Sequence, residues 1–593
     1  MAAKTILIQK MSWNIQQAIK LLVLLILMGY FMIWIMMPTN TFYLHWLPHL
    51  YAKLNSTYFG QQGSNILIYT FPGLFIATLG CIFLHLAKYA NAHDERTSKG
   101  TRFALWSRPA ITKGPLGIVS WIELCFLFMF TALLIWSISS YTHGMVKTIT
   151  RQSAAMMGVK VWQAKLQSVA LMLGLVGNIC LAFLFFPVTR GSSILQLFGL
   201  TSESSVKYHI WLGHAVMALF TVHGLCFIIF WADTHQLSIM LEWNKVGISI
   251  VAGEVSLLAG IAMWMTSFPR IRRKLFELFF YTHHLYVIFV VFFVFHVGFN
   301  YSCITLPGFY LFLIDRYLRF LQSQECVCLV SARVLPCQAV ELNFSKSPGL
   351  RYNPTSSVFI NVPSISKLQW HPFTVSSNSN MEPEKLSIVI KKRPVSAVLG
   401  QNNWLCLGAI ITSSFIMFLL LIAILNRYYI YPIDHNTGMI SSYSERAALS
   451  MLLLCVSIGV TASAAFVWNK KQKVKEMVQI QNNDIPTPTT SPGTGSWFNN
   501  ADIELESLPF QTFTRATQVH YGVRPNLKML HCQPIPETVA LVEDIVVNYV
   551  TDMDSAKLNR CRELLSMHED LKKAQKAFEF DQEELAHMSE GEV

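Results

Sequence analysis

Long apolar runs separated by short polar segments dominate the pattern along the first 470 residues. A helix needs about 20 consecutive apolar residues to cross the hydrocarbon of a bilayer, and ten runs come close to that length or exceed it. They lie at 21–37, 66–87, 117–137, 167–187, 207–231, 247–266, 279–298, 305–320, 404–426 and 448–468. The pattern predicts a polytopic α-helical membrane protein of about ten spans.

A different pattern fills the interval between the eighth and ninth runs. Residues 326–392 alternate apolar and polar positions in short stretches, which is the period of β-strands. After the last run, the Pro- and Thr-rich stretch 481–500 is typical of a linker. The chain then ends in an amphipathic helical pattern. The sequence therefore predicts a strand-rich unit outside the bilayer and a short helical tail.

Composition and charge support the membrane interpretation and suggest an orientation. Only 13% of the residues are charged, against roughly a quarter in soluble domains. Basic residues concentrate in 88–115 and 268–275, whereas 38–64 holds only Lys53. The positive-inside rule then places the N-terminus and the strand-rich unit in the cytosol. One segment fits this orientation poorly: 138–165, predicted outside, holds Lys147, Arg151, Lys160 and Lys165.

Two predicted spans each contain a pair of histidines, and the spacing within the two pairs is nearly the same. His209 and His223 are 14 residues apart, so on an α-helix they fall within about 40° of one face and about 21 Å apart along the axis. A second pair, His283 and His296, brackets 13 residues in a span of the same direction. The pattern places His209 level with His283 (or with its neighbour His284) and His223 level with His296.

Two facing imidazoles at each of two depths form the ligand set of bis-histidine haems. A structural zinc site would need four clustered ligands, and the twelve cysteines are scattered without any C-x-x-C. Six-coordinate haem iron transfers electrons without binding a substrate. The 13-residue spacing, however, requires a local bulge or kink in the second helix, because the two rings of a straight helix would be 120–140° apart. We expect His214 to be a packing residue.

The stretch LQWHPFTVSS at 368–377 carries a family resemblance. Together with the histidine brackets, it resembles the plant ferric-chelate reductases of the flavocytochrome b family, which includes NADPH oxidases. The resemblance implies that His209, His223, His283 and His296 ligate two b-type haems. It also implies a partial β-barrel of the ferredoxin-reductase type that binds FAD through a set of six residues. These are His371, Pro372, Phe373, Thr374, Ser376 and Ser377.

The family pattern is incomplete beyond the strands. The glycine-rich loops of an NADPH-binding domain are absent, and such loops let the backbone approach a pyrophosphate. Residues 534–586 instead resemble part of a histone-fold subunit of the general transcription factor TFIID, whose relatives pair with a second histone fold. Two unrelated families in one chain suggest a fusion of adjacent genes or of wrongly joined exons.

The sequence thus predicts six regions. They are membrane spans at 1–160, a haem-binding domain at 161–322, a truncated FAD barrel at 323–392, two late spans at 400–470, a linker with a remnant of the NADP-binding domain at 471–531, and the partial histone fold at 532–593.

The expected function is transfer of electrons from cytosolic NADPH, through FAD and two haems b, to extracellular Fe(III) chelates, or to Cu(II), at the plasma membrane for iron uptake. No protein side chain is expected to act as a catalytic acid, base or nucleophile, and no nucleic acid is expected to bind directly. Three alternatives remain open at this stage: a haem protein that NADPH cannot reduce, a superoxide-generating oxidase, and a transcription-complex interaction module in the tail.

Overall fold

The computed structural model describes residues 2–54, 56–93, 108–112, 117–200, 202–244, 247–323, 329–334, 340–346, 357–360, 370–377, 385–390, 404–436 and 442–483. These residues form two compact units, a helical bundle and a smaller unit that holds α12 and the strands β3 to β7. The predicted histone-fold tail and most of the predicted linker lie outside the described residues.

Among the described residues, nine helices are long and apolar enough to cross a membrane. They span Asn14–Met36, Gly60–Ala87, Trp121–Val146, Val161–Val188, Ser204–Asp233, Ile250–Ser267, Phe276–Ser302, Trp404–Asp434 and Tyr443–Asn469. Each coincides with one of the ten predicted runs. The chain is a multi-pass membrane protein, as its sequence predicts.

The remaining predicted run, 305–320, forms α15, Leu306–Gln322. This helix has 17 residues and rises about 25 Å, slightly less than the hydrocarbon thickness of a typical bilayer. Its first half is buried in the bundle core, and its second half carries Asp315, Arg316 and Arg319. α15 is therefore a short, internal and partly polar helix, unlike the nine long apolar helices.

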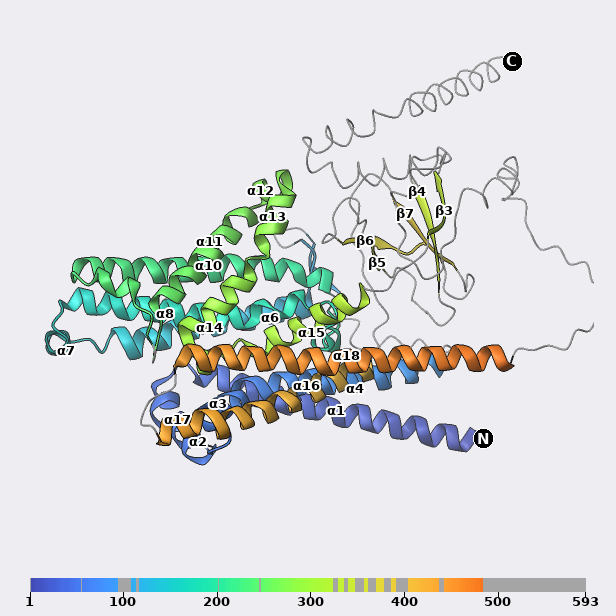
Figure 1. Cartoon of the computed structure of the whole chain (residues 1–593), viewed down its shortest axis with the longest axis horizontal. Coiled ribbons are helices and arrows are strands. Elements are labelled where there is room, and N and C mark those ends of the chain that lie inside the picture. Colours follow the sequence, from blue (N-terminus) through green and yellow to red (C-terminus); the bar gives the residue numbers. More distant parts are fainter. Residues whose placement is uncertain are drawn as a thin grey trace, which may run out of the picture. The chain divides into compact units, whose positions relative to one another are not determined.

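The bundle is built mostly from long helices joined by short ones (Figure 1). The long helices are α1 (Ala2–Met36), α4 (Phe71–His93), α6 (Trp121–Tyr141), α8 (Val161–Leu184), α10 (Ser202–Asp233), α11 (Ile250–Ser267), α14 (Tyr286–Ser302), α16 (Trp404–Leu425) and α18 (Tyr443–Asn483). The short helices are α2 (Leu47–Leu54), α3 (Gly60–Asn65), α7 (Arg151–Met156), α9 (Ser193–Leu197), α13 (Phe276–His283) and α17 (Tyr431–Asn436). Helix α12 (Pro269–Lys274) belongs to the smaller unit. Helix α18 continues beyond the predicted tenth span, through Asn483.

Tighter or wider helical turns and one small hairpin complete the bundle. Four π-helical turns continue neighbouring helices: η1 (Phe42–Trp46), η2 (Ile66–Thr70), η3 (Thr142–Val146) and η6 (Asn426–Ile430). Two 3₁₀ turns, η4 (Phe186–Val188) and η5 (Leu237–Leu241), end α8 and follow α10. The strands β1 (Pro109–Ile111) and β2 (Val119–Ser120) pair antiparallel just before α6.

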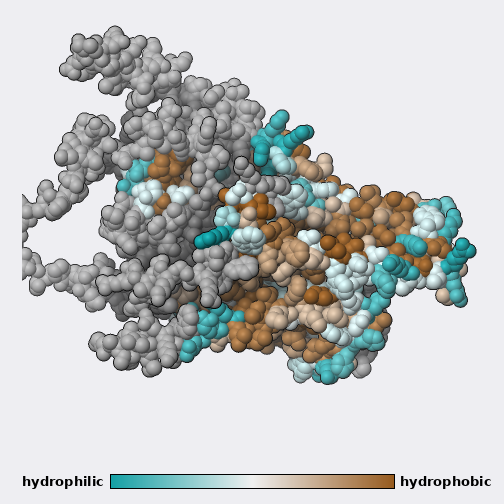
Figure 2. All heavy atoms as spheres, turned by 180° about the vertical axis from the view of Figure 1, so that it is seen from behind, coloured by the Kyte–Doolittle hydropathy of each residue, from teal (hydrophilic) through white to brown (hydrophobic). Residues whose placement is uncertain are grey.

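Small residues on α8 allow α10 to approach it closely. A Cβ at Gly177 would lie 2.5 Å from the ring of Phe220 on α10, so only glycine fits there. The bundle core is otherwise apolar and aromatic, with Tyr310, Phe418 and Ile179 almost completely buried. Hydrophobic residues also cover much of the outer surface, and hydrophilic ones gather toward the end where α7 lies (Figure 2). An apolar exterior of this kind is what a bilayer solvates.

The smaller unit contains antiparallel strands in two sheets. β4 (Val340–Ser345) lies between β3 (Leu329–Val334) and β7 (Lys385–Ile390), and β5 (Ser357–Ile360) pairs with β6 (His371–Thr374). An isolated bridge between Val375 and Ile388 links the two sheets. Their inner faces share one apolar core that includes Val340, Leu342 and Ile388. The predicted strand-rich unit is therefore present as two linked sheets over the described residues.

Candidate functional site

The four bracketed histidines come together in two pairs inside the bundle. His209 on α10 faces His283 at the end of α13, with ring centroids 6.2 Å apart and ring planes at 77°. His223 on α10 faces His296 on α14, with centroids 6.4 Å apart and planes at 74°. The structure thus selects His283, not His284, as the residue opposite His209. We call the two ends of the bundle the His209 end and the His223 end.

Hydrogen bonds from neighbouring helices orient three of these rings. Nδ1 of His209 lies 3.0 Å from the carbonyl oxygen of Leu184, and Nδ1 of His223 lies 2.7 Å from that of Ala170. Nδ1 of His296 lies 2.9 Å from the carbonyl oxygen of Ser249. A carbonyl oxygen only accepts, so Nδ1 carries the proton in each case. The lone pair is then on Nε2, which is the tautomer that a metal-ligating histidine needs.

The spacing of the paired rings matches ligation of one metal by two imidazoles. Two metal–nitrogen bonds of about 2.0–2.1 Å, with the half-width of each ring added, separate the ring centres by about 6.3 Å. The two observed separations, 6.2 and 6.4 Å, lie on either side of this value. Among the described residues, no group of three or more His, Cys, Asp or Glu side chains could hold a metal ion. The donor sets are therefore pairs, which fit haem iron.

Two glycines lie directly against the second pair of rings. A Cβ on Gly174 of α8 would come within 2.9 Å of His223 Nδ1 and Cε1. A Cβ on Gly253 of α11 would come within 2.6 Å of His296 Nδ1. Real Cβ atoms do not approach so closely, so both positions require glycine to keep the rings where they are. These two positions could not be identified from the sequence, because a single glycine in a helix has many explanations.

The kink that the 13-residue spacing requires is present. Helix α13 ends at His283 and α14 begins at Tyr286. Between them the backbone hydrogen bonds shorten to the i→i−3 pattern, with the N–H of Leu285 donating to Thr282 and that of Val287 to His284. This tighter turn changes the angular relation between His283 and His296. A second irregularity follows at Gly298, whose φ of 74° suits only glycine.

The other histidines of these spans have different partners. His214 accepts a hydrogen bond at Nδ1 from the indole N–H of Trp264, at 2.8 Å. Its ring also lies near that of Phe268, and it faces neither pair. Nδ1 of His284 lies 2.8 Å from the carbonyl oxygen of Phe280, one turn earlier in its own helix. Both therefore occupy packing positions, as the sequence predicts for His214.

Three phenylalanines lie between the levels of the two histidine pairs. Phe220 of α10 stacks on Phe293 of α14 at 6.2 Å, and Phe293 stacks on Phe289 at 6.4 Å. Phe220 precedes His223 by three residues, and Phe293 precedes His296 by three. The space between the two levels is thus filled by packed aromatic rings. The sequence alone could not single out these three among forty phenylalanines.

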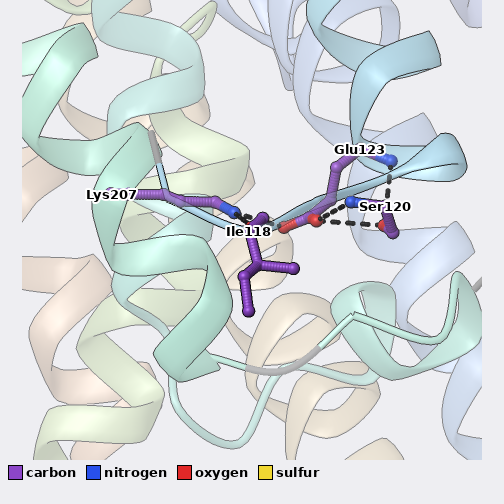
Figure 3. Close-up of polar contacts among 4 residues, drawn as sticks. All are labelled: Ile118, Ser120, Glu123 and Lys207. Carbon is purple, nitrogen blue, oxygen red and sulfur yellow. Dashed lines mark hydrogen bonds and ion pairs between the residues drawn. The ribbon is translucent and has the colours of Figure 1, made fainter. Parts of the chain in front are cut away.

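An ion pair fixes the start of α10 to α6, two residues before His209 (Figure 3). Nζ of Lys207 lies 3.1 Å from Glu123 Oε1 and donates to the carbonyl oxygen of Ile118 at 2.6 Å. Glu123 also accepts from the backbone N–H and the hydroxyl of Ser120, at 2.7 and 3.0 Å. The same carboxylate therefore closes the N-terminus of α6 and holds α10 against it.

The predicted flavin residues lie on β6 and just after it. Phe373 packs against the core of the smaller unit, so by strand alternation His371 shares its face and Thr374 points to the other. Burial lowers the pKa of the His371 imidazole below its usual range. Ser376 is exposed, and the Ser377 hydroxyl accepts a hydrogen bond from the backbone N–H of Ser387 at 2.9 Å.

The chain returns to the His209 end before it enters the strands. Asp315 of α15 accepts a hydrogen bond from the N–H of Gly191 at 3.1 Å. Gly191 follows the end of α8, where Leu184 holds His209. Helix α15 therefore runs from the His223 end to the His209 end, and β3 follows it in the sequence. The covalent link to the strand-rich unit leaves the bundle at the His209 end.

A helical membrane bundle with two imidazole pairs, followed by an antiparallel strand unit, defines a membrane-bound oxidoreductase. The chain belongs to the ferric reductase family. Residues 173–294 match the ferric reductase like transmembrane component, and residues 324–397 match an FAD-binding domain.

Similar proteins from Arabidopsis thaliana extend this match over most of the chain. Ferric reduction oxidase 2 is 43% identical over 86% of this chain and 90% of its own length. Probable ferric reduction oxidase 1 is 39% identical over 87% of this chain and 92% of its length. Ferric reduction oxidase 3, mitochondrial, is 40% identical over 87% of this chain and 89% of its length.

The first of these alignments also shows that the relative has residues that this chain lacks. It runs over 655 positions, whereas 86% of 593 residues is about 510. About 145 positions therefore hold residues of the relative alone. A gap of this size agrees with the missing glycine-rich loops noted in the sequence.

Proposed function

We propose that this protein is a transmembrane ferric-chelate reductase. Electrons enter at the His209 end, cross the bilayer through two haem b groups and reach Fe(III) chelates, or Cu(II), at the His223 end. The observation that carries this proposal is the facing of two imidazoles at each of two levels, with separations that suit one iron per pair. Haem, when bound, accepts and donates single electrons at each level.

The residues of the chain have separate roles in this scheme. His209 and His283 would hold the haem at one level, and His223 and His296 would hold the haem at the other. The carbonyl oxygens of Leu184, Ala170 and Ser249 hold three of these rings in the ligating tautomer. The stacked phenylalanines keep water out of the region between the levels.

We assign the FAD contacts to His371, Pro372, Phe373, Thr374, Ser376 and Ser377. Thr374 and the exposed Ser376 are placed to approach the flavin directly. Phe373 acts by shaping the strand, since its ring belongs to the core. FAD can accept a hydride and release single electrons, and this is the conversion that a haem chain requires.

NADPH is the proposed electron donor of the family, but the sequence of this chain is poorly suited to bind NADPH. The nucleotide-binding loops are missing from its sequence, and about 145 aligned positions are occupied only in the relative. We therefore propose that this chain holds haem and FAD while NADPH reduces it slowly. We also propose that the chain is divided into the six regions predicted from its sequence, with the same boundaries.

We place the protein in the plasma membrane, with the N-terminus and FAD unit in the cytosol, where it serves iron uptake. The basic loops 88–115 and 268–275 support this orientation. The superoxide-generating alternative is not favoured, because the similar proteins reported above are all named for ferric reduction. The tail at 534–586 is proposed to contact a histone-fold partner, and a pull-down of histone-fold proteins with the full chain would test it.

The ligand assignment is tested by replacing one histidine of a pair. His223→Ala should remove the haem of its level and abolish reduction of ferric chelates by the dithionite-reduced protein. His214→Ala is the matched control, because His214 lies in the same helix, faces neither histidine pair and is hydrogen-bonded to Trp264. Retention of both haems in His223→Ala, measured as haem per polypeptide, would refute the assignment.

A further inference from the structure

The segment from Lys147 to Lys165 joins α6 to α8 and is unusual for its position. It contains four cations, Lys147, Arg151, Lys160 and Lys165, and no aspartate or glutamate. Under the proposed orientation this segment lies outside, where the positive-inside rule leads one to expect few basic residues. We call it the basic segment. Neither the fold nor the ligation of haem explains its charge.

Contacts place the basic segment at the His223 end of the bundle. Helix α8 begins at Val161, directly after Lys160, and its Ala170 carbonyl holds His223. Lys165 is five residues before Ala170, about 8 Å along the axis, and Lys160 is about 15 Å away. Gln163 also donates a hydrogen bond to Asp233 at the end of α10, the helix of His223. The segment is therefore anchored one to three turns beyond the second histidine pair.

All four cations are available to a ligand. Each of the four side chains is exposed. Among the residues that the structure describes, no carboxylate forms an ion pair with any of them. Asp233 accepts a hydrogen bond from Gln163, and its single negative charge leaves the four cations in excess. The surface thus has a net positive charge that no neighbouring acid of the described chain neutralises.

Such a surface suits an anion, and Fe(III) chelates of polycarboxylates are anions. A cluster of like charges attracts an opposite ligand from solution and raises its association rate by about 10 to 1,000-fold at low salt. The attraction is screened beyond about 10 Å at 0.1 M ionic strength. A ligand held by the basic segment would remain within one to three helical turns of the His223 level.

We propose that the basic segment is the docking surface for negatively charged ferric chelates. This inference rests on the proposed reductase function and names its substrate class. The chelated Fe(III) gains one electron and becomes Fe(II), and a haem held by His223 and His296 would supply that electron. No covalent bond forms between chelate and protein, so the docking is electrostatic, and the reduced chelate exchanges with bulk solution.

Local accumulation of the chelate can be measured without turnover. A nitroxide is attached to the exposed residue Gln152 of α7, as Gln152→Cys, after replacement of the accessible native cysteines in the full chain. Paramagnetic Fe(III)–EDTA then relaxes the nitroxide in proportion to its local concentration, and a neutral nickel chelate reports simple accessibility. We expect relaxation by Fe(III)–EDTA to be about tenfold stronger at low salt in the native segment than in a variant with all four cations changed to glutamine.

The matched control is Lys53→Gln. Lys53 is exposed on α2, outside the basic segment, and its replacement removes one positive charge. This control should leave the relaxation of the nitroxide unchanged. High salt should abolish the difference between the native protein and the fourfold variant, in which all four cations are glutamine. Equal relaxation by Fe(III)–EDTA in the native segment and in the fourfold variant would overturn the proposal. The same would follow if the fourfold variant lost binding only to anionic lipid vesicles, because the cations would then serve lipid headgroups.

A second measurement separates this inference from the reductase function. Dithionite-reduced protein is mixed with ferricyanide, a trianion, and with hexaammineruthenium(III), a trication, and haem absorbance is followed. We expect the fourfold variant to slow reoxidation by ferricyanide about tenfold and to accelerate reoxidation by the trication. Equal effects on both acceptors would refute docking by charge, while the absence of reoxidation by any acceptor in the native protein would refute the reductase function itself.

Discussion

At the scale of single residues, the second imidazole pair depends on the two glycines that touch it. Gly253 leaves no room for a methyl group, because the added carbon would lie 2.6 Å from His296 Nδ1. The ring would have to move away from the Ser249 carbonyl that orients it. These glycines could not be predicted from sequence, because their importance arises from a helix that is distant along the chain.

Gly253→Ala should therefore displace His296 and weaken haem binding at that level. We expect haem occupancy to fall from about two per chain toward one, since a bis-histidine site does not survive the loss of one ligand. The measurement is the pyridine haemochrome absorbance per polypeptide. Gly213→Ala is the control, because a Cβ there has only Leu184 Cδ1 nearby, at 4.0 Å. Unchanged occupancy in Gly253→Ala would contradict the close approach.

The burial of His371 leads to a second prediction at this scale, which concerns the dependence of stability on pH. Burial lowers the pKa of its imidazole in the folded state relative to its usual value of 6.5. Below that value the unfolded chain binds more protons, so stability falls as the pH falls through 6.5 and levels off below the folded pKa. His371→Gln should flatten the fall in stability of the strand unit between about pH 7 and pH 5. Limited proteolysis of the full chain within the strand region would show it, and an unchanged pH dependence would contradict this role.

At the scale of elements, the sequence predicted most of the helices and one of their irregularities. Nine of the ten apolar runs became long helices because their apolar residues cover every face, a pattern that leaves little ambiguity. The 13-residue bracket demanded a kink, and the break between α13 and α14 supplies it. The choice of His283 over His284 could not be made from sequence, since the exact place of the break decides which ring turns toward His209.

The contact between α6 and α10 offers a test of how elements are held together. Glu123→Gln retains a side chain that can cap the N-terminus of α6 but removes the negative charge that pairs with Lys207. Glu123 is 5% exposed and Lys207 retains some access to water. We expect a loss of about 2–3 kcal/mol in the free energy of unfolding, somewhat less than for a fully buried pair.

Ser120→Ala gives the comparison. It removes only the cap of α6 and should cost about 1 kcal/mol. Reversible unfolding in mixed micelles would measure both variants. A smaller effect of Glu123→Gln than of Ser120→Ala would show that the ion pair contributes little, and that the cap alone fixes the start of α6.

At the scale of the whole molecule, the chain leaves for the strands at one end of the bundle and carries the basic segment at the other. The chain enters the strand unit from the His209 end, and the basic segment lies at the His223 end. This division follows from the topology. An even number of helices crossing the bundle between the basic segment and the strands would be needed to bring both features to the same end. The sequence predicted a path for electrons through the two histidine pairs of the bundle. The residues that this chain lacks relative to Ferric reduction oxidase 2 determine which donor can reduce it.

Purified full chain should therefore show two different responses to reductants. Dithionite should reduce both haems completely, whereas NADPH should reduce them at least tenfold more slowly than free reduced flavin does, because no nucleotide-binding loop holds it beside FAD. The haem absorbance on mixing measures both rates. Fast reduction by NADPH would mean that another part of the chain binds the nucleotide, and would contradict the proposal.

The carbonyl oxygens that hold the imidazoles have a consequence for the speed of electron transfer. Three rings are hydrogen-bonded to α8 and to the residue before α11, not to their own helices, so each ring is held in one orientation. With a haem bound at each level, such fixed rings would limit the nuclear rearrangement that accompanies each electron. A rigid mounting of this kind favours rapid, reversible passage in a protein whose task is to transmit electrons without transforming anything within the membrane.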